Sequence, residues 1–220
     1  MALDGIYSSV ILRDVVERNR ITDQALLRKL ILFLADNVGN LTSPSKIGNV
    51  LVHEGELREN KKKKSPAGKT ISGYIEALEK AYVFYGVNRY DLKGKQYLKT
   101  QNKYYIVDTG IRNLLLGYRD ADRGHILENV VYFEILRRGC GAAIGKIGEN
   151  EVDFVAERPE EKIYYQVTET LAGENTRERE LAPLRCIPDS YEKIVLSMDR
   201  HFATSHDGIK IINVIDWLLS

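Results

Sequence analysis

The spacing of apolar residues predicts four helices in the first part of the chain. The second is the clearest, because leucine, isoleucine and phenylalanine recur there every three to four residues and Gly39 follows to end the helix. Thr22 or Asp23 can cap its start, and Ser43 or Ser45 can cap the third helix. In chain order the predicted helices cover 8–20, 23–38, 43–52 and 69–81.

Strand-like patterns follow these helices. Val83–Tyr90 and Tyr104–Val107 are rich in aromatic and β-branched residues, and the polar segment between them has Gly94 as its turn candidate. Helices followed by a β-ribbon are the order of a winged helix-turn-helix, in which residues 93–103 are the wing. The first half of the chain is therefore predicted to have this fold.

The second half of the chain has a different order of helical and strand patterns. A helical pattern is followed by a strand, by a hairpin that turns at Arg158–Glu161, by a polar helix and by a further strand. This α-β-β-β-α-β order predicts a layered unit whose central strands are covered on both sides. In chain order these elements cover 126–138, 141–147, 150–168, 174–185 and 191–198, and a short strand at 209–213 and a helix through Trp217 end the chain.

The distribution of charged residues also divides the chain into two halves. Residues 1–110 hold 18 Lys/Arg against 12 Asp/Glu, whereas residues 111–220 hold 14 against 19, although the net charge of all 220 residues is only +1. We therefore expect a basic domain over 1–110, a connector over 111–122 and an acidic domain over 123–220. The basic domain is suited to a polyanion; the alternative is that the two halves attract each other.

Two sets of residues in the basic half are candidates for nucleic-acid binding. The start of the fourth helix, which can enter a major groove, presents Lys69, Thr70, Ser72 and Gly73. The wing carries Lys93, Lys95, Lys99 and Lys103, which can contact phosphates. The run Lys61–Lys64 is interpreted as a solvated loop, and winged helices also bind proteins, so the fold alone does not choose the partner.

A candidate metal site lies in the second half. On the first strand of the hairpin, Val152 and Phe154 are expected to face one way and Asp153 the other. The paired strand places Gln166 beside Asp153, while Glu128 lies on the preceding helix. Carboxylate and amide oxygens are ligands for Mg²⁺, which metal-dependent nucleases use to activate water. The lysine that normally follows the third ligand is replaced by Thr168, and Arg177 or Arg179 is a possible substitute. The alternative is a solvated strand edge with a satisfied glutamine.

The sequence gives no support to several other classes of protein and of functional site. There is no apolar run of about 20 residues for a membrane span and no signal-peptide pattern, so we expect a cytoplasmic protein. Cys140 and Cys186 are predicted to be reduced core residues. The dispersed histidines do not predict a zinc site, and neither a nucleophile elbow nor an ATP phosphate loop is present.

Five blocks of sequence together resemble the C-terminal part of a prokaryotic AAA+ ATPase family, in which an ATPase core precedes a C-terminal domain of unknown function. They are FYGVNRYDLKG (84–94), KYYIVDTGIRN (103–113), LENVVY (127–132), EVDFVA (151–156) and YQVT (165–168). The resemblance covers nearly the whole chain and implies a winged helix followed by a domain similar to the PD-(D/E)xK nucleases, that is, a restriction-endonuclease-like domain. The chain has no counterpart of the ATPase core.

The resemblance also implies roles for particular residues. Glu128, Asp153 and Gln166 match the acidic positions of the nuclease superfamily, with Asp153 and Glu128 as possible Mg²⁺ ligands, and Thr168 departs from its lysine. A glutamine and valine at this position look usual for the ATPase family, which favours a degenerate site. The sequence therefore predicts a recognition module for nucleic acid or a partner protein, working with an ATPase core. The alternative is a Mg²⁺-dependent endonuclease acting on DNA or RNA.

Overall fold

The computed structural model describes residues 5–56, 68–200 and 204–220. It has mixed α and β structure with a multistranded sheet, and it divides into two compact units. The first unit contains the chain up to Gly86 together with Gln101–Tyr118, and the second contains Val87–Thr100 together with Arg119–Ser220. The second unit thus begins again inside the segment predicted as a connector, but it also takes a segment that was predicted to belong to the first domain.

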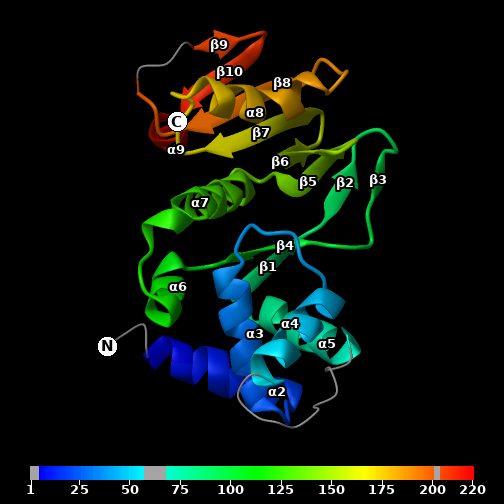
Figure 1. The fold of residues 1–220 in the computed structure, drawn as a ribbon, viewed down its shortest axis with the longest axis vertical. Helices are drawn as coiled ribbons and strands as arrows, with labels where there is room; N and C mark the ends of the chain where they lie inside the picture. The colour runs from blue at the N-terminus through cyan, green and yellow to red at the C-terminus, as the bar shows by residue number, and fades with distance from the viewer. Residues whose placement is uncertain (1–4, 57–67, 201–203) are drawn as a thin grey trace. The chain divides into compact units, whose positions relative to one another are not determined.

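The first unit is mainly helical (Figure 1). The predicted helix over 8–20 consists of a π-helical turn followed by a short α-helix, and Asp23 caps the next helix by accepting a 2.9 Å hydrogen bond from the amide of Leu26. Its helices are η1 (Tyr7–Asp14), α2 (Val15–Asn19), α3 (Gln24–Asp36), α4 (Pro44–Glu56), α5 (Gly68–Lys80) and α6 (Thr109–Leu116). The predicted lysine loop 61–64 lies outside the described residues.

The core of this unit forms around α3. Leu27, Leu30, Ile31 and Leu34 recur at helical spacing and are almost completely buried, as their pattern predicts. The buried Arg112 of α6 donates from Nε to the carbonyl oxygen of Ala35 at the end of α3, over 3.0 Å. This bond gives a partner to a carbonyl that the helix itself leaves without one.

The β-ribbon differs from its prediction. Val83–Tyr90 is not one strand: it separates at Asn88 into β1 (Phe84–Val87), which pairs with β4 (Lys103–Ile106), and β2 (Arg89–Asp91). β2 forms a hairpin with β3 (Gln96–Tyr97) and pairs in parallel with β5 (Gly141–Ile147). The backbone bonds from Ile144 to Asn88 and from Leu92 to Lys146 hold the hairpin on β5. Most of the predicted wing is therefore the edge of the sheet in the second unit.

The second unit contains an eight-stranded mixed sheet in the order β3-β2-β5-β6-β7-β8-β10-β9. Antiparallel pairing links β5, β6 and β7, whereas β7, β8 and β10 are parallel. Its remaining elements are η2 (Asp120–Asp122), α7 (Arg123–Arg137), β6 (Asn150–Arg158), β7 (Glu161–Thr168), α8 (Glu174–Arg185), β8 (Glu192–Ser197), β9 (Ser205–His206), β10 (Ile209–Asn213) and α9 (Val214–Leu219). From α7 to β8 they follow the predicted α-β-β-β-α-β order.

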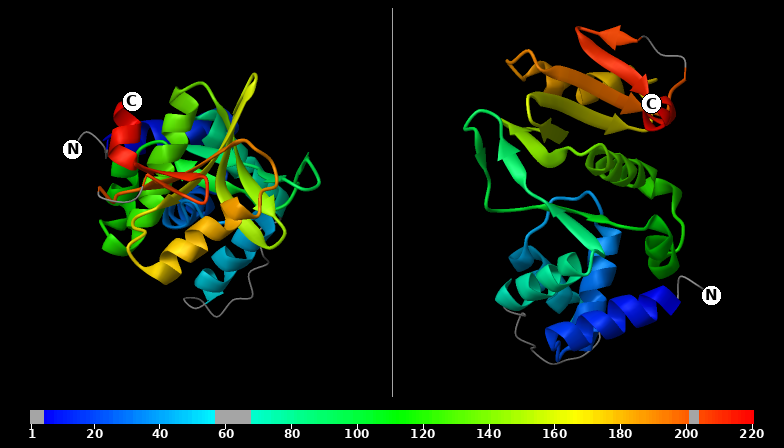
Figure 2. Two further views of the ribbon diagram at one scale, coloured as in Figure 1. Left: turned by 90° about the horizontal axis from the view of Figure 1, so that it is seen from above. Right: turned by 180° about the vertical axis from the view of Figure 1, so that it is seen from behind.

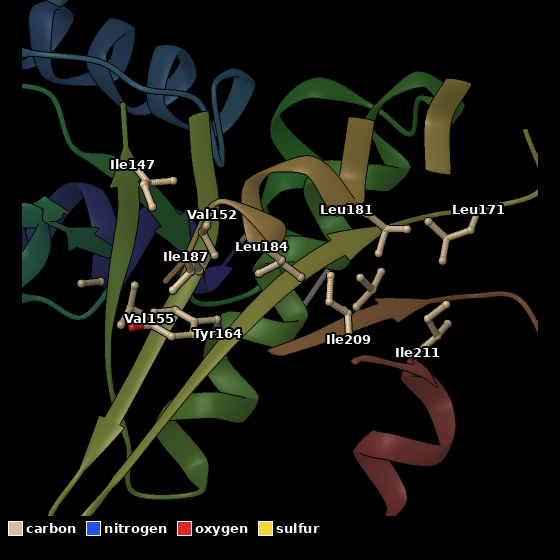
Figure 3. Packing of buried hydrophobic residues seen from close by; sticks show 12 residues of the cluster. Ile147, Val152, Val155, Tyr164, Leu171, Leu181, Leu184, Ile187, Ile209 and Ile211 are labelled. Carbon is tan, nitrogen blue, oxygen red and sulfur yellow. The ribbon is translucent and has the colours of Figure 1, made fainter. Parts of the chain in front are cut away.

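Helices cover both faces of this sheet, with α8 on one side and α7 and α9 on the other (Figure 2). On the α8 side, Leu181 and Leu184 pack into a buried cluster with Val155, Tyr164 and Val195 (Figure 3). On the opposite side, Phe154 stacks on Tyr132 of α7 at 6.0 Å between ring centroids, and Tyr165 lies 5.4 Å from Trp217 of α9. The strands are therefore apolar on both faces because both faces are buried.

The structure also bears on the expectations for the two cysteines and for membrane-spanning helices. Cys140 and Cys186 are free thiols, but the prediction that they are core residues is wrong, because Cys140 is half-buried and Cys186 is exposed. Both follow the end of a helix, where their short side chains do not reach the core. In the described part of the chain, no helix is long and apolar enough to cross a membrane.

Truncation of Leu181 tests the core on the α8 side. Leu181→Ala should lower the free energy of unfolding of the second unit by about 2–5 kcal/mol, because the side chain is fully buried and leaves a cavity. Urea unfolding can be followed by the fluorescence of Trp217, the one tryptophan in the chain. Leu219→Ala is the control, since Leu219 is 82% exposed, and equal losses in the two variants would contradict this packing.

Candidate functional site

The candidate site lies on the α8 side of the sheet, where the pairing of β5 with β6 changes register. Ala143 is opposite Val155 and Gly145 is opposite Val152, so Asp153 and Phe154 together stand opposite one residue of β5. This is the geometry of a β-bulge, which redirects side chains and is frequent beside functional sites.

The bulge corrects the predicted alternation of β6. Val152 and Phe154 were expected to share a face, but Val152 joins the cluster under α8 while Phe154 packs on α7. Gly145 confirms that Val152 and Val155 point to the same side, since a Cβ added to it would lie 3.0 Å from a side-chain atom of each. A larger residue at Gly145 would therefore collide with the bulge.

The structure brings Asp153 and Gln166 together, as their strand positions predict. Gln166 is 8% exposed, and its Oε1 accepts from the amide of Asp153 at 3.4 Å. Asp153 is half-buried, and its Oδ2 accepts from the amide of Val167 at 2.9 Å. The regular ladder between β6 and β7 ends beside this pair, so the two side chains replace backbone bonds that the bulge removes.

A third side chain, Glu180 of α8, completes the network. Its Oε2 accepts from Gln166 Nε2 at 3.0 Å, and its Oε1 accepts from Arg179 Nη2 at 2.8 Å. Glu180 is 8% exposed, so this carboxylate keeps its charge away from water with one amide and one guanidinium as partners. Arg179, considered from the sequence as a substitute cation, is thus linked to the pair through Glu180.

The sequence reasoning missed Glu180, although a signal was available. Glu180 is four residues before Leu184, so the helical repeat places it on the same side of α8 as this leucine. An acid in the buried stripe of a helix needs a partner, and Gln166 is the polar residue that the facing strand provides.

The other residues considered for the metal site, Glu128 and Thr168, lie in different environments. Glu128 is 7% exposed on α7, the helix that covers the face opposite α8. Thr168, at the position of the missing lysine, donates from Oγ1 to the carbonyl oxygen of Thr170 at 3.2 Å. Among the described residues, no group of three or more His, Cys, Asp or Glu side chains could hold a metal ion. The polar atoms of Gln166 and Asp153 are instead directed at protein groups.

An aromatic group lies farther along the same face. Lys162 Nζ is 5.6 Å from the ring centres of Tyr90 and of Tyr191, and the ammonium also pairs with Glu157. Tyr164 donates its hydroxyl hydrogen to Asp189 at 2.7 Å, and burial together with this bond raises the pKa of the phenol. The ammonium of Lys162 is therefore engaged by Tyr90, Tyr191 and Glu157.

The candidate nucleic-acid residues are exposed with one exception. Lys69, Thr70, Ser72 and Gly73 lie on the first turns of α5, while Lys93, Lys95 and Lys99 lie on the β2–β3 hairpin and just after it. Lys103 is 4% exposed on β4, so the prediction that it contacts phosphate is wrong. It falls in a strand whose four residues are all buried, because that strand is part of the core rather than of an exposed wing.

Comparison with known proteins places the chain in a family. A family model described as a domain of unknown function, DUF8612, matches residues 1–122. The chain belongs to the DUF8612 family. The matched segment covers the first unit and the β2–β3 hairpin, and it ends at residue 122, shortly after the second unit begins again at Arg119.

Two relatives of this DUF8612 protein are longer than the chain. An uncharacterized protein of Haemophilus influenzae is 42% identical over 217 residues, which are 99% of this chain and 52% of that protein. An uncharacterized protein of Methanocaldococcus jannaschii is 32% identical over 173 residues, 79% of this chain and 33% of that protein. The chain thus spans about half the length of the first relative and the match a third of the second. No solved structure matches it.

Removal of the central amide tests the network. Gln166→Ala should lower the free energy of unfolding by about 1–3 kcal/mol, because Glu180 and the Asp153 amide lose a partner in a buried place. Gln96→Ala, at an exposed position of β3, is the matched control and should change stability little. Urea unfolding followed by Trp217 fluorescence measures the free energy of unfolding of both variants. A Gln166→Ala variant as stable as the control would show that the network does not contribute to stability.

Proposed function

We propose that this chain is a recognition module of a longer protein and that it binds nucleic acid without cutting it. In this proposal the first unit is a winged helix-turn-helix and the second is a degenerate domain related to the PD-(D/E)xK nucleases. The observation that carries the proposal is the closed hydrogen-bond network of Asp153, Gln166 and Glu180.

The network supports a non-catalytic role because its polar atoms have protein partners. A nuclease metal needs several oxygens that converge on one point and are free to coordinate. Here Gln166 has both its oxygen and its nitrogen engaged, and one Asp153 oxygen is engaged by Val167. Binding of Mg²⁺ through these atoms would require the network to open and would leave Glu180 without the amide.

Nucleic acid is the proposed partner because each unit carries exposed cationic or hydroxyl groups at predicted contact positions. On α5 these are Lys69, Thr70 and Ser72, and on the β2–β3 hairpin and just after it they are Lys93, Lys95 and Lys99. Such residues supply phosphate contacts, which position a protein on nucleic acid without reading its sequence.

We further propose that the full-length protein is an AAA+ ATPase and that the chain is its C-terminal part. The sequence blocks that resemble that family support this, as does the greater length of the two relatives. In such a protein the chain would direct the ATPase to its target, and the target is nucleic acid or, in the alternative, a partner protein.

One observation favours a second function. Glu180 brings a second carboxylate next to Gln166 and Asp153, and two acids near a bulge resemble part of a Mg²⁺ site. The rival is therefore a Mg²⁺-dependent endonuclease that uses Asp153 and Glu180; Glu128, named from the sequence as a third member, lies on α7 at the opposite face of the sheet.

A salt titration tests nucleic-acid binding. The affinity for a short DNA duplex, measured by fluorescence anisotropy, should fall with salt, and replacing Lys93, Lys95 and Lys99 by alanine should reduce the slope of log affinity against log salt by about three, since each lysine–phosphate contact contributes about 0.9. Lys29→Ala, at an exposed lysine of α3, should leave the slope unchanged. Absence of binding at low salt would contradict the nucleic-acid partner and leave the protein partner.

A cleavage assay separates the two functions. Supercoiled plasmid incubated with the chain and Mg²⁺ or Mn²⁺ should remain uncut, and Asp153→Ala should give the same result, because the network occupies the ligand atoms. Cutting by the wild type that Asp153→Ala removes would establish the endonuclease instead.

A further inference from the structure

A cavity of about 350 Å³ lies in the first unit, between the turn that follows α2 and the exposed side of α5. Its size is within the range of small-ligand sites. Helices α2 and α5 contact each other within this unit (Figure 1). The residues that line it include Asn19, Arg20, Thr22, Thr70, Glu76 and Lys80.

Arg20 occupies an unusual position at this cavity. It ends α2 with φ of 50°, and the backbone bonds Arg20 N to Glu17 O and Ile21 N to Val16 O form a Schellman turn. Glycine is the preferred residue at this left-handed position, because a side chain there is strained. Arg20 therefore stands at a place where the backbone conformation favours glycine, which points to a use for its side chain.

The charges of the lining favour an anion. Lys80 forms a 2.7 Å ion pair with Glu76, and this hydrogen bond with the accompanying charge attraction lowers the pKa of the Glu76 carboxyl, so the two charges offset each other. Arg20 is exposed, and within the described part of the chain its guanidinium has neither a carboxylate nor a hydrogen-bond partner. The net charge of the lining is therefore the positive charge of Arg20, with the hydroxyls of Thr22 and Thr70 beside it.

We propose that this cavity binds a phosphate group, held by the guanidinium of Arg20 and by the hydroxyls of Thr22 and Thr70. Arginine donates two parallel hydrogen bonds to a phosphate, and the remaining oxygens accept from hydroxyl groups. A phosphate suits this set better than a carboxylate, since it has more acceptor oxygens to share among three donors.

The phosphate has two possible sources, and one of them rests on the proposed function. Thr70 lines the cavity and follows Lys69 on the turn of α5 proposed to contact nucleic acid, so a backbone phosphate can enter it when α5 binds. A small phosphorylated molecule offers the same chemistry without nucleic acid.

The decisive variant is Arg20→Gly. Glycine relieves the backbone strain, so the melting temperature should be unchanged or higher, while the affinity for inorganic phosphate, titrated by calorimetry at constant ionic strength, should fall about tenfold. A purely structural role for Arg20 predicts no change in phosphate affinity.

A matched control exists in the same unit. Tyr82 ends α5 with φ of 55°, with the same pair of backbone bonds, Tyr82 N to Glu79 O and Val83 N to Leu78 O. Tyr82→Gly makes the same backbone change away from the cavity and should keep wild-type phosphate affinity. Phosphate binding that Arg20→Gly leaves intact, or no phosphate binding by the wild type at millimolar concentration, would overturn the proposal.

A DNA arm separates the sources. If duplex DNA binds, inorganic phosphate competes with it and Arg20→Gly weakens both, the cavity takes a backbone phosphate. If phosphate binding depends on Arg20 but DNA does not bind, the cavity takes a small phosphorylated molecule and the nucleic-acid proposal fails by itself. If DNA binds equally to the wild type and to Arg20→Gly and phosphate does not compete with it, nucleic-acid recognition stands and the cavity does not take a backbone phosphate. In that case phosphate binding that Arg20→Gly weakens assigns the cavity to a small phosphorylated molecule, and phosphate binding that Arg20→Gly leaves intact overturns the cavity proposal.

Discussion

The hydrogen bond between Gln166 and Glu180 is the interaction on which the organisation of the second unit depends. It joins the central strand β7 to α8 through two side chains that are each 8% exposed. A buried carboxylate without this partner would be costly, whereas the paired one fixes the register of the helix over the sheet. The apolar cluster of Leu181 and Leu184 then packs on the same side of α8.

The bulge in β6 explains why a polar network exists in an apolar face. Insertion of one residue interrupts the ladders on both sides of Asp153, and the freed amides of Asp153 and Val167 find side-chain oxygens instead. The same insertion returns Val152 to the α8 side, so the strand keeps its apolar contacts on either side of the polar pair. Residues of the kind that form a metal centre therefore join β6, β7 and α8 through hydrogen bonds to one another and to the backbone.

The two helix ends of the first unit illustrate how one backbone geometry serves different purposes. Arg20 and Tyr82 both occupy the left-handed position after a helix, and both turns are closed by the same two bonds. Tyr82 is 69% exposed and is not among the residues that line the cavity beside α5, whereas Arg20 is. Strain of equal size is therefore informative only together with the surroundings of the side chain.

The sequence by itself determined the helices with strong apolar periodicity, the cap at Asp23, the order of elements from α7 to β8 and the meeting of Asp153 with Gln166, because these depend on neighbours along one strand or helix. Only the tertiary structure decided that β2 and β3 join the sheet of the second unit, that Lys103 is buried and that Glu180 completes the network. Strand pairing between distant segments and partners for buried charges are set by contacts across the fold, which local patterns do not encode.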